Sequence, residues 1–126
     1  ALLRSDLHSG LAALMGRVSG CQRSLREPRL VAAGRTATAA LERAALWLEA
    51  GQDREVLQAG ARRLALTLAR ALELALLCEH AQWLMDHRGD RRGYAAALRC
   101  ARLPVDLMHE VDTELDRVLM DGPPGA

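Results

Sequence analysis

Four side chains with the chemistry to bind anions or move protons recur along one long apolar stretch: Arg63, Arg70, Glu73 and His80. A guanidinium group binds phosphate or carboxylate, and a Glu–His combination can act as acid and base. On a helix, Arg70 and Glu73 lie one turn apart and can form an ordinary intrahelical ion pair. No Gly-rich phosphate loop and no nucleophile accompanies them, so we favour a polar contact at an interface over catalysis and assign no catalytic or cofactor-binding residue.

A metal site is a second kind of chemistry that helical proteins support. A di-iron carboxylate site needs two Glu-x-x-His pairs and further inward-facing glutamates. The chain offers one distant relative of that motif, the run Asp106-Leu107-Met108-His109, within an acidic stretch typical of a solvated face. We therefore predict no metal site.

The stretch 61–84, which carries the polar residues, is long and apolar enough to resemble a membrane span. A span would have to bury charged side chains at about 2.5–3.5 kcal/mol each near its centre. We therefore predict a central helix of a soluble bundle over residues 54–87 and no membrane segment. The charged residues in question are Arg62, Arg63, Arg70, Glu73 and Glu79.

The composition indicates an all-α protein. Half of the residues are hydrophobic, but there is no Phe and no Ile, and Leu, Ala, Arg and Glu are strong helix formers. Seventeen basic residues, all Arg, face 16 acidic ones. A nucleic-acid-binding protein usually shows a clear basic excess, so this balance disfavours nucleic acid as a partner.

Apolar spacing and cap residues divide the chain into an up-and-down bundle of four to five helices. Gly51 is suited to end the second helix, and Asp53 and Asp90 to begin the third and fourth. We expect one bundle over residues 1–120 and a disordered tail over 121–126. The predicted helices cover residues 3–25, 28–50, 54–87 and 91–103, with a fifth beginning at Pro104 and burying Leu107, Val111, Leu115 and Val118.

The cysteines indicate a reducing compartment. Cys21, Cys78 and Cys100 are odd in number, have no CxxC spacing and fall among apolar residues. No signal-peptide pattern opens the chain, so we expect a cytoplasmic protein. The chain begins with Ala1 rather than Met, where the sequence already looks helical, which suggests a part of a larger protein.

The segment GARRLALTLARALELALLCEHAQWLMDH (60–87), the Arg/Ala-rich helix 91–103 and VAAGRTATAALERAALWLEAG (31–51) resemble the C-terminal helical region of acyl-CoA dehydrogenase-like flavoproteins. The closest likeness is to actinobacterial and alkylation-response members. The resemblance implies a bundle that contacts other subunits and helps to enclose FAD, hence a homo-oligomer and a partnership with the remaining domains of a parent oxidoreductase.

The family's catalytic carboxylate has no counterpart here that a motif supports; Glu73, Glu79 and Glu110 are unsupported candidates. We therefore expect the isolated chain to be inactive and to need no cofactor of its own. A stand-alone interaction or regulatory domain, binding a protein partner or a small apolar ligand, is the alternative. Nucleic-acid binding through the Arg-rich helix 91–103 is a third and minor one.

Overall fold

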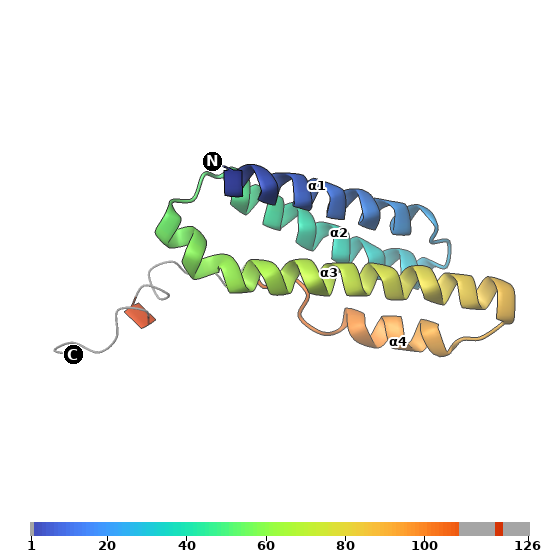
Figure 1. Cartoon of the computed structure of the whole chain (residues 1–126). Helices are drawn as coiled ribbons and strands as arrows, with labels where there is room; N and C mark the ends of the chain where they lie inside the picture. The colour runs from blue at the N-terminus through green and yellow to red at the C-terminus, as the bar shows by residue number, and fades with distance from the viewer. Residues whose placement is uncertain (1, 109–117, 120–126) are drawn as a thin grey trace.

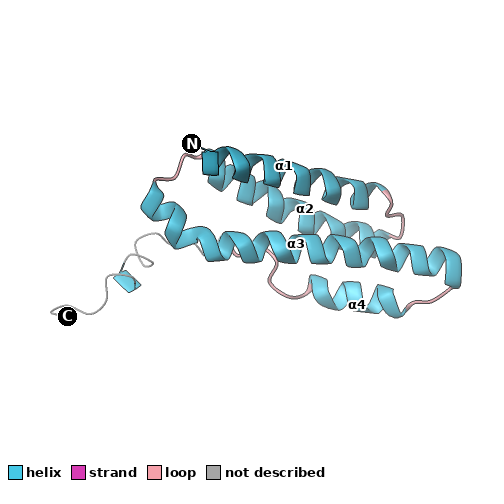
Figure 2. Cartoon of the chain, viewed as in Figure 1, coloured by secondary structure: helices cyan, strands magenta, loops and turns pink. Residues whose placement is uncertain are grey.

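The fold is that of a computed structural model, which describes residues 2–108 and 118–119. The described part contains helices α1 (Leu2–Arg23), α2 (Pro28–Glu49), α3 (Arg54–Arg88) and α4 (Arg92–Ala101), and no strand. Helix α2 runs antiparallel to both α1 and α3, and α4 lies beside the C-terminal half of α3 (Figure 1). Short loops join them (Figure 2). The prediction of an all-α helical bundle is confirmed.

The core is built largely from small side chains. Leu30, Leu41 and Leu74 are fully buried, and burial of each contributes about 1.5–3 kcal/mol. Alanines and cysteines fill most of the space between them, so the helix axes can approach closely. The buried small residues include Ala33, Ala37, Ala40, Ala71, Ala75, Ala81, Cys21 and Cys78.

The turn between α1 and α2 is fixed by a residue from α3. Pro28 occupies the first turn of α2, and the Glu27 carboxylate accepts a hydrogen bond from the Leu30 N–H at 2.9 Å. The Gln82 side-chain oxygen accepts from the backbone N–H groups of Arg26 and Glu27, at 3.0 and 2.9 Å. One buried amide of α3 therefore holds the reversal of the chain.

The predicted ends of α2 and α3 are confirmed. Gly51 follows α2 with φ 73°, the left-handed conformation that glycine adopts at low cost. The Asp53 carboxylate accepts from the Val56 N–H at 2.8 Å and so caps α3. Gly89, with φ 60°, ends α3 after Arg88. None of the helices in the described residues is both long and apolar enough to cross a membrane.

The chain after α4 differs from the prediction. Helix α4 ends at Ala101, and residues 104–107 are not helical, so the prediction that a fifth helix begins at Pro104 is wrong. These residues cross the bundle instead, and Asp106 pairs with Arg43 of α2 at 2.9 Å. The predicted positions Val111 and Leu115, like the tail 121–126, lie outside the described residues.

Candidate functional site

The four polar residues predicted to act together on α3, Arg63, Arg70, Glu73 and His80, have different neighbours in the structure. We call them the polar strip. Arg70 donates from Nη1 to the Pro104 carbonyl oxygen at 2.7 Å. One turn earlier, the fully buried Thr67 accepts a hydrogen bond from the Leu107 N–H at 3.1 Å. Arg63, two turns before Arg70, is partly buried. Arg70 and Thr67 therefore hold the segment that follows α4.

Arg70 does not pair with Glu73 in the described part of the structure; its side chain bonds the Pro104 carbonyl instead. Glu73 is exposed and lines two adjoining cavities between α3 and the end of α4, of about 750 and 320 Å³. Cys100 lines both. Burial raises the pKa of the Cys100 thiol, and the Glu73 carboxylate raises it further.

The larger of these cavities is rich in guanidinium groups. Arg92, Arg99 and Arg102 line it together with Glu73 and the apolar side chains of α4. All three arginines are exposed. Because these arginines are exposed, an anion bound to them would stay largely in water. They therefore suit a phosphate or carboxylate that a second surface also contacts.

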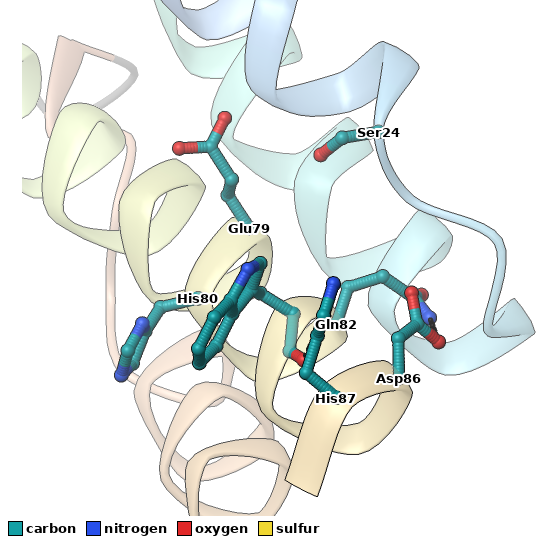
Figure 3. Close-up of a pocket in the computed structure, with 7 residues that line it drawn as sticks. Ser24, Glu79, His80, Gln82, Asp86 and His87 are labelled. Carbon is teal, nitrogen blue, oxygen red and sulfur yellow. Dashed lines mark hydrogen bonds between the residues drawn. The ribbon is translucent and has the colours of Figure 1, made fainter.

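His80, the last residue of the polar strip, lies where three rings form a row. The His80 and Trp83 rings are nearly parallel, with centroids 6.3 Å apart, and His87 stacks on Trp83 at 4.6 Å. The Arg88 guanidinium lies 5.8 Å from the Trp83 ring centroid. Figure 3 shows His80 and His87 projecting from α3.

A cavity of about 560 Å³ lies beside these rings and is lined by Ser24, Glu79, His80, Gln82, Trp83, Asp86 and His87 (Figure 3). Its acidic groups already have partners. Glu79 forms an ion pair with Arg17 at 3.0 Å, which lowers the pKa of the Glu79 carboxyl. Asp86 forms an ion pair with Arg26 and accepts from Gln82. The cavity therefore offers aromatic faces and two exposed imidazoles, while both of its carboxylates are engaged in ion pairs.

The thiols are also unsuited to catalysis. Burial raises the pKa of Cys78 to about 11 and that of Cys21 above its usual value, so both are protonated near neutral pH. No group of three or more His, Cys, Asp or Glu side chains that could hold a metal ion occurs within the described residues.

One face of α3 is uncovered along most of its length. Glu79 on one flank pairs with α1, whereas Leu77 on the other lines a cavity with α4. Between them runs a row of seven residues spaced by three or four, exposed except for the partly buried Leu72, which we call the α3 stripe; the exposed Leu66 and Glu73 border it on the α4 side. The residues of the stripe are Ala65, Ala69, Leu72, Leu76, His80, Trp83 and His87.

Sequence reasoning did not find the roles of Thr67 and Gln82. Both are buried polar residues on a helix face that otherwise packs against apolar side chains. Their presence on that face is a signal for a buried hydrogen bond, since burying an unpaired polar group is costly. Their partners are backbone N–H groups of loops, which a helical projection of α3 does not contain.

The comparisons with known proteins place this bundle in a family. A search of curated proteins found no match, and a search of solved structures found none either. The family model described as "Acyl-CoA dehydrogenase 11 C-terminal domain-like" matches residues 11–118, which include α2, α3, α4 and most of α1. The chain therefore belongs to the acyl-CoA dehydrogenase 11 C-terminal domain-like family.

Proposed function

We propose that this chain is the C-terminal helical bundle of an acyl-CoA dehydrogenase-like flavoprotein, in which it makes oligomer contacts and helps to enclose FAD. Family membership over residues 11–118 supports the assignment of the parent protein as acyl-CoA dehydrogenase-like. The observation that carries the role is the α3 stripe, an apolar and aromatic face on the central helix of the bundle. The free cysteines accord with a cytoplasmic location.

The stripe favours a protein contact because its exposed apolar residues are continuous rather than scattered. Trp83 is 44% exposed and Leu76 is 37% exposed, and Leu66, at 38%, lies at the edge of the same face. Burying apolar surface contributes about 25 cal/mol per Å², and contiguous patches of this kind mark interaction sites. A subunit or a domain of the parent that covers this face would gain that free energy.

The Arg-lined cavity of this chain could form only one part of an FAD site in the larger parent protein. The guanidinium groups of Arg99 and Arg102 have the charge to bind the cofactor's diphosphate, whereas Arg92, on the same wall, is paired with Asp90. The described residues around them contain no buried polar group aimed into the cavity, so they would close a site that other domains form. This chain's Arg99 and Arg102 would bind and orient the cofactor, which would supply a hydride acceptor for the acyl-CoA substrate.

The mass and absorption spectrum of the native protein that contains this sequence test the proposal. We expect a polypeptide larger than 126 residues that shows flavin bands after purification. Arg99→Ala in that protein should lower flavin occupancy, while Arg35→Ala, an exposed arginine of α2 that lines none of these cavities, serves as the control. A colourless product of the size of this chain would overturn the proposal.

A second candidate is a domain that binds a small apolar ligand, and one observation favours it. A groove of about 300 Å³ between α1 and α3 is lined almost entirely by Leu and Ala side chains. Binding of a fluorescent apolar probe would test it, with Ala61→Gln as the variant that fills the groove with a polar side chain. Equal binding of the probe by the unsubstituted chain and by the variant would exclude this groove as the binding site. Its lining residues are Leu7, Leu57, Gln58, Ala61, Leu64, Ala65 and Leu68.

A further inference from the structure

The two halves of the α3 stripe differ in size. The first half presents Ala65 and Ala69, beside the shallow apolar groove between α1 and α3. The second half presents the ring row that includes Trp83 and His87. Leu76 lies midway, eleven residues from both Ala65 and His87. The small side chains of the first half therefore leave room that the large rings of the second half could fill.

We propose that the α3 stripe is the contact between two copies of this chain, whose α3 helices lie antiparallel and cross at Leu76. The inference rests on the proposed function, because it names the surface for the oligomer contacts. A two-fold interface uses the same patch on both subunits, so the patch must fit itself. About the two-fold axis at Leu76, Trp83 lies opposite the partner copy's Ala69, and His87 opposite its Ala65.

The spacing along the stripe specifies a helix as the partner. Steps of three and four residues produce the seam by which helices pack side by side. The stripe repeats after eleven residues, which is about 3.67 per turn, so it stays nearly straight on α3. Two such helices can remain in contact from Ala65 to His87, about 33 Å at 1.5 Å per residue.

A parallel arrangement of the same two faces fits poorly. It would place Trp83 against Trp83 and Ala69 against Ala69, so one end would be overfilled and the other would be left hollow. It would also place the exposed Arg62 beside its copy, and like charges that face each other repel. The antiparallel arrangement avoids both costs, which is why the proposal specifies orientation as well as surface.

Disulfide cross-linking of the 126-residue chain tests the orientation. In a Cys100→Ser background, we would prepare Ala65→Cys with a mass tag and His87→Cys without one, then oxidise each alone and as a mixture. Cys21 and Cys78 are buried and stay out of the reaction. We expect one mixed product and no self-cross-linked product at low concentration. Self-cross-linking of each variant alone would overturn the antiparallel arrangement.

A size exchange tests the register. Ala69→Trp places two indoles in one space, and Trp83→Ala leaves a space empty, so each should weaken self-association about tenfold or more. The double variant exchanges the large and small positions and should recover the self-association affinity of the unsubstituted chain. Sedimentation equilibrium would measure all four proteins. A double variant that is as weak as the sum of the two single changes would overturn the pairing of Ala69 with Trp83.

A charge within the stripe separates failure of this inference from failure of the proposed function. Leu76→Glu should weaken self-association by about 30-fold, because it buries a carboxylate at the two-fold axis. Leu46→Glu, on α2 and 65% exposed, is the matched control and should leave it unchanged. Dimers that survive Leu76→Glu, or a chain that is monomeric throughout, would overturn the inference. The flavin spectrum of the native protein would still decide the proposed function.

Discussion

Trp47 of α2 lies directly over Gly60 of α3, where a Cβ on Gly60 would come within 2.6 Å of the indole Cζ2. The contact brings the N-terminal half of α3 against α2, and the buried Leu48 and Leu64 lie in the core cluster that Trp47 packs against. A glycine in mid-helix normally costs about 0.5–1 kcal/mol. Here it provides the space that a larger side chain would take from the indole.

Gly60→Ala should therefore destabilise the bundle although alanine favours helix. Overpacking costs about 1–3 kcal/mol, which exceeds the helix gain, so we expect a net loss of about 1–2 kcal/mol in the free energy of unfolding. Urea denaturation would measure it. Gly16→Ala in α1 is the control, since nothing lies within 4 Å of the added Cβ; it should stabilise the protein. Equal stabilisation by both changes would contradict the packing of Trp47 on Gly60.

Gln82→Leu should destabilise the protein by about 1–3 kcal/mol, because it leaves two backbone N–H groups of the α1–α2 turn without an acceptor. Gln82 is 5% exposed, so water does not readily replace its oxygen. Urea denaturation and amide hydrogen exchange at Arg26 and Glu27 would measure the loss. Gln58→Leu, on the exposed face of α3, should change neither. Unchanged exchange at the turn would show that the Gln82 contact does not hold it.

The sequence predicted those features of the fold that depend on neighbours along the chain. Gly51 and Asp53 have local roles, because a left-handed cap and a side-chain cap involve residues only a few positions away. Pro104 shows the limit. Proline suits the first turn of a helix and also suits extended backbone, and here Arg70, from 34 residues earlier, takes the Pro104 carbonyl that a helix would use.

The candidate site was less accessible to sequence reasoning for the same reason. A helical projection gives the angle of each side chain but not the element that covers it. His80 and Arg70 lie on neighbouring parts of the predicted strip, yet Arg70 holds the segment after α4 while His80 joins the exposed ring row. The stripe itself has helical spacing, and only the positions of α1 and α4 show that it is left uncovered.

Arg92→Ala should raise the pKa of the Asp90 carboxyl from about 2 toward its ordinary 3.8, because the hydrogen bonds from Arg92 lower it. The folded state binds this proton more weakly than the unfolded state does. The ion pair therefore stabilises the fold at pH values above 3.8, and this contribution is lost as the pH falls through about 2. NMR titration of the Asp90 carboxyl would measure the change. Arg91→Ala, whose guanidinium lies over Tyr94, is the control and should leave the titration in place.

Thr67→Val should release the segment that follows α4 while preserving side-chain volume. The Leu107 N–H loses its acceptor in a fully buried position, at a cost of about 1–3 kcal/mol. Amide exchange at Leu107 should accelerate, and urea denaturation should show lower stability. Thr36→Val is the matched control, since the exposed Thr36 hydroxyl bonds only within α2 at 3.4 Å. If both variants leave exchange at Leu107 unchanged, Thr67 does not anchor this segment, and Arg70 with Asp106 must hold it against the bundle.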